Sequence, residues 1–406
     1  MVSAKEEQMK KIYTRLTTLA IVLTILLVFL PTAALSAEYT YTTIDVPGSS
    51  YIFASGINDS NEIVGWYGDP GVHSFIYSGG IFTPIGFLTD TWAFGINNSG
   101  DIVGYGIDWW YHNFLYSGGI FTTIDVPGST TNWGAKGISN SGDIVGAYGD
   151  DLGRHGFLYS GGQFTQIDVP GAVEWTTPTG INNSGDIVGI YANRDEPSKH
   201  RGFIISGGIF IPIDVPGATG TDVNGINDHG DIVGRFYDVN RGFLYSRGIF
   251  TTIHVPGAEW TGASGINNFG SIVGTYGDAT GYHGFIATPV RQHVSIDIKP
   301  GDDSNCLNLN YHGVIPVAIL GSSDLDVYDV DIPTMSLQGL SIKMVGKADR
   351  LLAHFDDING DGYTDLIAQF EDSGGWTGNG DGYATLTGYL LDRTPIEGSD
   401  SICLVP

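Results

Sequence analysis

A short stretch near the C-terminus carries oxygen-bearing residues at a spacing that suits a hard cation. The residues at positions 1, 3, 5, 7 and 9 of this loop are Asp357, Asn359, Asp361, Tyr363 and Asp365. Calcium loops supply side-chain oxygens at positions 1, 3, 5 and 9, a backbone carbonyl at position 7, and a glycine at position 6, which is Gly362 here. Position 12 is Ala368 rather than glutamate, so the last ligand must come from elsewhere. The spacing predicts a calcium site; the alternative is a solvated acidic turn.

Tryptophans form a second set of candidate binding residues. They lie shortly before a repeated glycine or in a long link between strands: Trp92, Trp109, Trp110, Trp133, Trp175 and Trp260. Large rings on exposed loops give flat apolar surfaces that stack on sugar rings or fill protein hot spots. The alternative is that these rings fill gaps between neighbouring sheets. The fifth of the six repeats described below has Thr221 and Asp222 at this place, so a circle of aromatic residues would be incomplete.

The chain contains two cysteines, Cys306 and Cys403. In an exported chain this pair predicts one disulfide that joins the first and last segments of a C-terminal domain, with free thiols as the alternative. Closing a loop of this length would stabilise the domain by about 4 kcal/mol in the chain-entropy model.

These residues must be positioned by a repetitive framework. The tripeptide Gly-Ile-Asn/Ser recurs at intervals of 39 to 45 residues, beginning at Gly56, Gly95, Gly137, Gly180, Gly225 and Gly265. Such a period is typical of propeller blades with four strands each. In the second repeat, turns at residues 98–100 and 117–119 separate short strand-like runs, and their glycines suit tight hairpins. The repeats therefore predict an all-β fold: a six-bladed β-propeller of four antiparallel strands per blade over residues 38–289.

The ends of the repeat region predict how the ring closes. The sixth repeat stops after its third strand, at residues 284–289, while an unmatched fourth strand lies at residues 41–48. Together they would form one composite blade, which removes exposed sheet edges. We therefore expect residues 41–46 to pair antiparallel with the strand around Phe285. An open β-solenoid is the competing architecture.

Several repeated strings carry a resemblance to a known family. Gly-Ile-Asn, Asp-Ile-Val-Gly, His-Gly-Phe-Leu-Tyr-Ser-Gly-Gly and Thr-Thr-Ile-Asp-Val-Pro-Gly recur in register over residues 38–289. They resemble the HAF-type repeats of extracellular bacterial proteins. The resemblance implies an extracytoplasmic location and a β-repeat fold, and it brings no catalytic residues.

Comparing the repeats with one another points to a binding face. Two kinds of connection, the Asn-Asn-Ser-Gly and Ser-Gly-Gly turns, hardly vary in length, whereas the links from strand two to three and from strand four to one vary greatly. In an up-and-down blade these two classes lie on opposite faces. The face formed by the variable links, called the variable-loop face below, is therefore the candidate binding face.

Repeated histidines and acids have simpler interpretations than catalysis. His73, His112, His155 and His283 precede the third-strand phenylalanine, but arginine takes this place in two repeats, and a metal ring would not accept arginine. Structural hydrogen bonding is therefore expected. The acids that follow the hairpin glycine are expected to stabilise turns; they are Asp101, Asp143, Asp186 and Asp231.

The N-terminal segment and the net charge limit where the protein is located and what it binds. Residues 1–37 hold lysines, an apolar run from Leu19 to Leu30 and small residues, which predicts a cleaved secretory signal peptide; an uncleaved membrane anchor is the alternative. A net charge of −26 excludes the electrostatic footprint of a nucleic-acid or anionic-lipid binder. We expect a secreted, extracellular or cell-surface protein without other membrane contact.

After a linker at residues 290–293 the composition changes, and residues 294–406 predict a small β-sandwich-like calcium-binding domain. Its strings resemble an accessory module of secreted bacterial proteins, which implies attachment or stability. No nucleophile elbow, sialidase box or zinc-protease motif occurs. We therefore expect a non-enzymatic binding or structural protein whose partner is a carbohydrate or a protein. The alternative is a secreted glycoside hydrolase or polysaccharide lyase.

Overall fold

A computed structural model describes residues 39–405 except 87, 109, 171–172, 303, 309–312, 347–349, 373–379 and 392–393. The chain divides into two units, residues 1–37 and 38–406. The predicted signal peptide and Trp109 lie outside the described residues. Within the described residues, no helix has the length and apolar character needed to cross a membrane.

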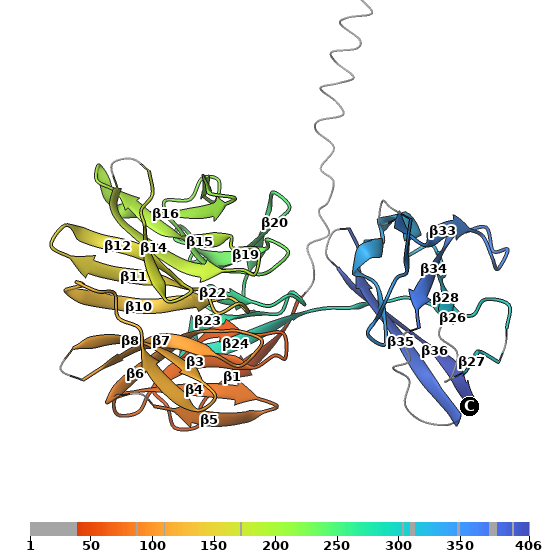
Figure 1. The fold of residues 1–406 in the computed structure, drawn as a ribbon, viewed down its shortest axis with the longest axis horizontal. Helices are drawn as coiled ribbons and strands as arrows, with labels where there is room; N and C mark the ends of the chain where they lie inside the picture. Colours follow the sequence, from red (N-terminus) through yellow and green to blue (C-terminus); the bar gives the residue numbers. More distant parts are fainter. Residues whose placement is uncertain are drawn as a thin grey trace, which may run out of the picture. The chain divides into compact units, whose positions relative to one another are not determined.

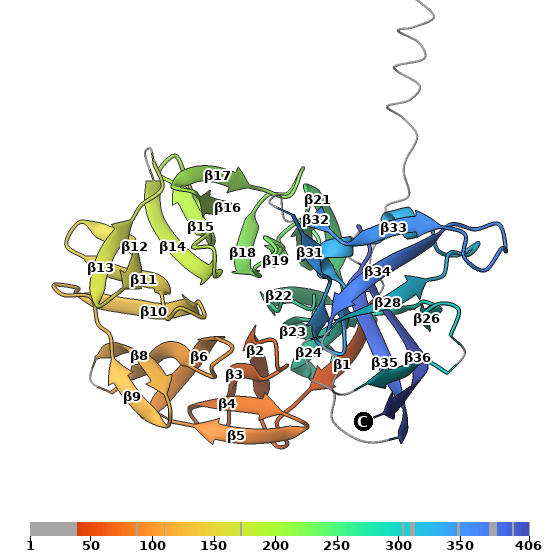
Figure 2. The ribbon, with the colours of Figure 1, turned by 45° about the vertical axis from the view of Figure 1, so that its right-hand side comes forward.

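Each sequence repeat forms a group of four antiparallel strands. The first three groups are β2 (Tyr51–Ile57), β3 (Ile63–Gly68), β4 (Val72–Ser78) and β5 (Ile81–Ile85); β6 (Asp90–Ile96), β7 (Ile102–Ile107), β8 (Tyr111–Ser117) and β9 (Ile120–Thr123); and β10 (Thr131–Ile138), β11 (Ile144–Asp150), β12 (Gly153–Ser160) and β13 (Gln163–Ile167). The next two are β14 (Val173–Ile181), β15 (Ile187–Asn193), β16 (Glu196–Ser206) and β17 (Ile209–Ile213); and β18 (Thr221–Ile226), β19 (Ile232–Phe236), β20 (Arg241–Ser246) and β21 (Ile249–Ile253). The last repeat contributes β22 (Trp260–Ile266), β23 (Ile272–Asp278) and β24 (Gly281–Pro289). In Figures 1 and 2 these groups follow one another around a common centre, a propeller-like arrangement.

The N-terminal strand completes the last group. β1 (Tyr39–Ile44) pairs antiparallel with β24, and Thr43 lies opposite Phe285. Ile44 is fully buried, and the hydroxyl of Thr43 is 3.0 Å from that of Tyr276 in β23. We expected residues 41–46 to pair antiparallel with the strand around Phe285, and this pairing is confirmed over residues 41–44. It covers the edge of β24 that would otherwise present unpaired backbone groups.

A circle of hydrogen bonds links the constant turns of all six repeats. In each turn, the residue after the Gly-Ile-Asn/Ser tripeptide donates its backbone N–H to the side-chain Oδ1 of the equivalent residue in the next repeat, over 2.7–2.9 Å. The donors in order are Asp59, Asn98, Asn140, Asn183, Asp228 and Asn268. The last donor, Asn268, bonds to the first residue, Asp59. The contacts therefore return to their starting point, which the open solenoid does not allow.

The repeated glycine allows the innermost strands to meet at the centre. A Cβ atom on any of the six glycines would lie 2.9–3.4 Å from the Cα of the next glycine in the circle. Real Cβ atoms rarely lie so close to backbone atoms, so a larger residue would force the neighbouring strand to shift. The isoleucines that follow are 7–8 % exposed and line cavities on both sides, so they close the centre. The glycine of the tripeptide therefore lets neighbouring strands approach closely, and its isoleucine closes the centre of the circle.

Each group also has one fully buried phenylalanine in its third strand: Phe75, Phe114, Phe157, Phe203, Phe243 and Phe285. Gly104 is the glycine of the Ile-Val-Gly string in the second repeat. A Cβ added to it would lie 2.8 Å from the ring of Phe114, so the glycine makes room for this ring. Burying a side chain of this size stabilises the fold by about 2 to 3 kcal/mol.

Residues after 289 form a separate set of sheets. The strands are β25 (Gln292–His293), β26 (Ile296–Ile298), β27 (Cys306–Asn308), β28 (Val314–Ile319), β29 (Ser336–Leu337), β30 (Leu340–Ser341), β31 (Met344–Val345), β32 (Arg350–Leu351), β33 (Ala353–Asp356), β34 (Asp365–Glu371), β35 (Gly380–Tyr389) and β36 (Pro395–Val405), with short 3-10 helices η1 (Val327–Asp329) and η2 (Ile332–Thr334). One sheet has the order β25-β36-β35-β29-β30, with β27 also paired to β36, and a second has β26-β28-β34-β33. Of the predicted linker, residues 292–293 form β25 beside β36.

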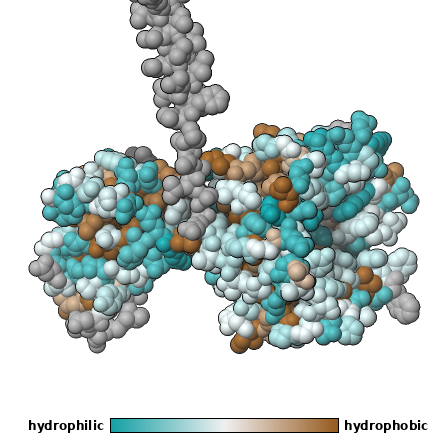
Figure 3. Space-filling model, turned by 180° about the vertical axis from the view of Figure 1, so that it is seen from behind, coloured by the Kyte–Doolittle hydropathy of each residue, from teal (hydrophilic) through white to brown (hydrophobic). Residues whose placement is uncertain are grey.

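The two C-terminal sheets share one apolar core, and a disulfide lies within the first sheet. Leu337 and Leu386 from the first sheet and Val317 and Phe370 from the second belong to one buried cluster. Cys306 and Cys403 are disulfide-bonded, as predicted, where β27 and β36 run in parallel. On the molecular face seen in Figure 3, apolar residues lie in separate patches among polar ones.

Candidate functional site

The variable-loop face opens into a cavity at the centre of the repeat circle. One residue from each repeat, immediately before the repeated glycine, contributes to its wall: Ser55, Phe94, Lys136, Thr179, Asn224 and Ser264. The cavity measures about 80 Å³, and the isoleucines form its floor. Because the innermost strands run from the variable loops toward the constant turns, this wall faces the variable-loop side. Lys136 is its one charged residue.

The ammonium group of Lys136 lies against aromatic rings. Its Nζ atom is 3.3 Å from the ring centroid of Phe94 and 5.6 Å from that of Tyr105. Burial, together with the positive charge of Arg154, lowers the pKa of Lys136 to about 7. Within the described residues, this lysine makes no ion pair. Cation–π contact therefore holds a cation that is poorly hydrated.

Arg154, the second residue of β12, lies against two tryptophan rings. Its guanidinium carbon is 4.6 Å from the ring centroid of Trp133 and 5.2 Å from that of Trp175. Its Nε atom is buried and has no hydrogen-bond partner in the described part of the chain. Burial lowers the pKa of Arg154 from its usual value. The contact with Trp175 joins the third repeat to the fourth.

Aromatic pairs also occur on this face in the first, second and sixth repeats. Phe53 stacks on Trp66 with ring centroids 4.2 Å apart, and Trp92 stacks on Tyr105 at 4.7 Å. Edge contacts join Trp66 to Trp92 and Trp260 to Tyr282, and a tilted contact joins Tyr282 to Phe53. Trp66 and Tyr282 therefore contact rings of a neighbouring repeat.

The predicted tryptophans thus fall into two classes. Trp110 is 70 % exposed and Trp133 is 46 % exposed, so both leave ring surface open to solvent. Trp92, Trp175 and Trp260 are partly buried and pack against neighbouring rings or cations, which matches the gap-filling alternative at least in part.

A charged network occupies the place where the fifth repeat breaks the aromatic pattern. Asp222 is 8 % exposed, and its carboxylate lies 2.7 Å from His200 Nδ1. The carboxylate also accepts a hydrogen bond from the Tyr237 hydroxyl at 2.6 Å and one from the Arg235 guanidinium at 3.2 Å. Despite burial, which opposes ionisation, hydrogen bonds from His200 and Tyr237 and the nearby charges hold the pKa of Asp222 below its usual value. Burial and the contact with Asp222 raise the pKa of Tyr237 to about 12.

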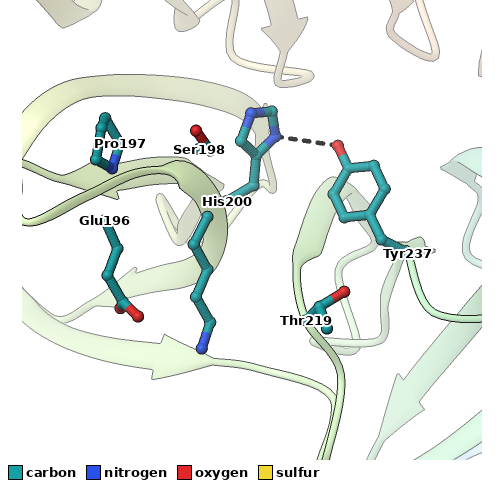
Figure 4. Close-up of a pocket in the computed structure, with 7 residues that line it drawn as sticks. Glu196, Pro197, Ser198, His200, Thr219 and Tyr237 are labelled. Carbon is teal, nitrogen blue, oxygen red and sulfur yellow. Dashed lines mark hydrogen bonds between the residues drawn. The ribbon is translucent and has the colours of Figure 1, made fainter.

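His200 and Tyr237 also line an open pocket of about 540 Å³ beside the long link of the fourth repeat. Figure 4 shows the imidazole and the phenol turned toward each other, with Glu196, Pro197, Ser198 and Thr219 around them. Trp175 touches the imidazole edge-on at a centroid distance of 5.0 Å. A neutral imidazole that donates Nδ1–H to Asp222 keeps Nε2 as a proton acceptor. The sequence showed only the missing tryptophan, not this network.

The repeated histidines and acids behave as structural groups. His112, His155 and His283 each bring Nδ1 to 2.6–3.0 Å from the aspartate of an Ile-Asp-Val-Pro-Gly string, and Arg201 bonds to the equivalent Asp214. His73 instead lies near backbone oxygens. Asp101, Asp186 and Asp231 accept from the turn asparagines, and Asp143 accepts from Ser141. The hydrogen-bonding interpretation is confirmed.

The predicted calcium loop is tightly folded by its own hydrogen bonds. Asp357 accepts from the backbone of Gly360 and Gly362, Asn359 accepts from Asp361, and Asp361 accepts from Tyr363, over 2.8–3.1 Å. Asp365 is fully buried and accepts from Gly321 and Ile358. Among the described residues, no group of three or more His, Cys, Asp or Glu is arranged to hold a metal ion. The calcium site stays a prediction.

No protein-family model matches the chain, and no curated protein matches it. Solved structures similar to it include virginiamycin B lyase from Staphylococcus aureus (12% identity, 62% of this chain and 100% of that chain, TM-score 0.40) and the WD40 β-propeller domain of Doa1 (12%, 61% and 96%, 0.36). TolB from Acinetobacter baumannii is 10% identical over 58% of this chain and 54% of its own, with a TM-score of 0.37. At these identities and TM-scores, the likenesses say nothing about what this chain binds.

Proposed function

We propose that this chain is a secreted or cell-surface six-bladed β-propeller of the HAF-repeat type that binds carbohydrate through its variable-loop face. The observation that carries the proposal is the set of rings and cations on the variable-loop face: Phe94 and Lys136 line the central cavity, and Trp110 and Trp133 are exposed. Exposed indole faces with polar neighbours stack on sugar rings. A protein partner would use the same rings as hot spots, but Ser55, Thr179 and Ser264 in the central cavity suit hydrogen bonding to a sugar substituent.

The test is a glycan-array screen of the mature protein, with turnover assayed on every bound glycan. The proposal expects binding to a defined class of saccharide without cleavage. Binding to no glycan at all would contradict it.

Cleavage of polysaccharide is the second candidate function, and one observation favours it. His200 is held by the buried carboxylate of Asp222 beside an open pocket, which is the arrangement that general-base catalysis uses. If this candidate holds, bound glycans are cleaved, and His200→Gln abolishes turnover while it leaves affinity within about threefold. Binding without turnover would set the candidate aside.

We propose that residues 294–406 form a β-sandwich-like accessory domain with calcium as its cofactor. The supporting observation is the loop itself: Gly360 and Gly362 have φ of 74° and 90°, which lets the chain turn sharply between the oxygen-bearing residues.

Asp361→Ala should lower the melting temperature of this domain only when calcium is present, because an ion that binds the folded state alone stabilises it by linkage. Differential scanning calorimetry in calcium and in excess chelator measures this. An equal loss in chelator would mean that Asp361 acts only through its hydrogen bond to Tyr363.

A further inference from the structure

Two cations lie close together on the variable-loop face without acidic partners. The chain has 44 acidic residues against 18 lysines and arginines. Three arginines of the repeat region form ion pairs within it: Arg194 with Glu174, Arg201 with Glu196 and Asp214, and Arg235 with Asp222. In the described part of the chain, neither Lys136 nor Arg154 forms an ion pair or a hydrogen bond through its side chain. An acidic protein that leaves two neighbouring cations unpaired has a place for an anion.

The surroundings of these cations restrict what that anion can be. Rings, not carboxylates, contact both groups: Phe94 and Tyr105 at Lys136, and Trp133 and Trp175 at Arg154. Among the described residues, the buried Nε of Arg154 has no hydrogen-bond acceptor. Uncharged hydrogen-bonding residues, Ser55, Thr179 and Ser264, line the cavity beside Lys136. A ligand here must offer an anionic group and a ring or hydroxyl-bearing body.

We propose that Lys136 and Arg154 bind the carboxylate of a uronic acid residue in an acidic polysaccharide, with the exposed face of Trp133 against the sugar ring. The inference rests on the carbohydrate-binding function proposed above and names its ligand class. The guanidinium fork matches a carboxylate geometrically. The cavity of about 80 Å³ accommodates a small substituent rather than a whole sugar, so the sugar body lies outside, where Trp133 is exposed.

The mutual effect of the two cations supports this assignment. Burial, and to a smaller extent the charge of Arg154, disfavours protonation of Lys136 and lowers its pKa to about 7. A bound carboxylate would reverse that effect and favour the charged amine. Lys136 faces Phe94 of β6, Tyr105 of β7 and Arg154 of β12; burial raises the pKa of Tyr105 to about 12, so neither Tyr105 nor Arg154 titrates near neutral pH.

The test is isothermal titration with trigalacturonate, its methyl ester and a neutral galactose trisaccharide. The wild type should bind the acid at least tenfold more tightly than the ester, because esterification removes the charge and keeps the shape. Arg154→Gln and Lys136→Met should each lower affinity for the acid about tenfold or more. The matched control is Arg194→Gln, on an exposed arginine paired with Glu174, which should change affinity less than twofold.

The pH dependence gives a second readout. Affinity of the wild type for trigalacturonate should fall from pH 6 to pH 8.5 as Lys136 loses its proton, and this fall should be absent in Lys136→Met. Equal affinity for acid and ester, or full affinity in Arg154→Gln, overturns the inference. If neutral glycans bind in those cases, the proposed function survives; if no glycan binds, the proposed function itself fails.

Discussion

Replacing Lys136 with methionine should stabilise the folded protein at neutral pH. The lysine amine is removed from water between Phe94 and Tyr105 and lies near the charge of Arg154, so its pKa falls to about 7. Methionine keeps an unbranched apolar body in the same space and removes the charge. The lowering of the pKa from 10.5 to about 7 sets an upper limit of about 5 kcal/mol at pH 6, at about 1.4 kcal/mol per pKa unit. Solvent screening of the partly exposed side chain reduces the expected gain to about 2 to 4 kcal/mol. A residue that weakens the fold is easier to understand as a binding group than as a structural one.

The pH dependence follows from the same shift. Between about pH 7 and the usual pKa of lysine, the unfolded chain binds the Lys136 proton and the folded chain does not. The stability of the wild type should therefore rise with pH through this window, and the rise should be smaller in Lys136→Met. Above about pH 10 the raised pKa values of Tyr105 and Tyr237 act in the opposite direction, so the comparison ends at pH 9.5.

Denaturant unfolding from pH 6 to pH 9.5 measures both effects. Lys199→Met is the matched control in the same repeat region, and it should change stability by less than about 0.5 kcal/mol. A Lys136→Met variant that is less stable than the wild type at pH 6 would show that the amine has a stabilising partner.

Gly137→Ala should destabilise the repeat region by about 2 to 3 kcal/mol. The added Cβ would meet the Cα of Gly180 at 2.9 Å and the carbonyl oxygen of Thr179 at 3.2 Å, both backbone atoms of the next repeat. Backbone cannot rotate away as a side chain can, and the circle of six strands cannot widen at one point without moving its neighbours. Overpacking of this kind typically costs about 1 to 3 kcal/mol.

Gly86→Ala is the control for this substitution. A Cβ at Gly86 meets nothing within 4 Å, and its φ is not positive, so alanine there should be neutral or slightly stabilising. Thermal unfolding of both variants measures the difference. Equal melting temperatures would mean that the innermost strands do not pack as closely as described.

Repetition made much of the fold predictable. The recurrence of Gly-Ile-Asn, the two constant turns and the displaced fourth strand each correspond to a backbone requirement, and the pairing of β1 with β24 follows from them. The disulfide was predictable because two cysteines bracket one domain. The circle of hydrogen bonds from Asp59 to Asn268 was not anticipated, although every repeat carries Asn or Asp at that position.

The central residues of the candidate site could not be predicted because they do not recur from repeat to repeat. Lys136 and Arg154 occur once each, in positions where the other repeats have unrelated residues, so repeat comparison gives them no weight. Their importance lies in what they touch: Phe94 from the second repeat, Trp175 from the fourth. The same holds for His200, Asp222 and Tyr237, which meet only when the fourth and fifth repeats pack together. The absence of tryptophan near Asp222 was the one signal that pointed to that place.

The most direct test of the central claim, that the variable-loop face binds carbohydrate, is to measure affinity and melting temperature together for Trp110→Ala and Trp133→Ala. The ligand is the tightest saccharide from the array, and Phe269→Ala, an exposed ring in a constant turn, is the control. If the claim holds, at least Trp133→Ala weakens binding by about 1 to 3 kcal/mol with little change in melting temperature, while the control binds normally. Variants that lose stability and keep full affinity would contradict it.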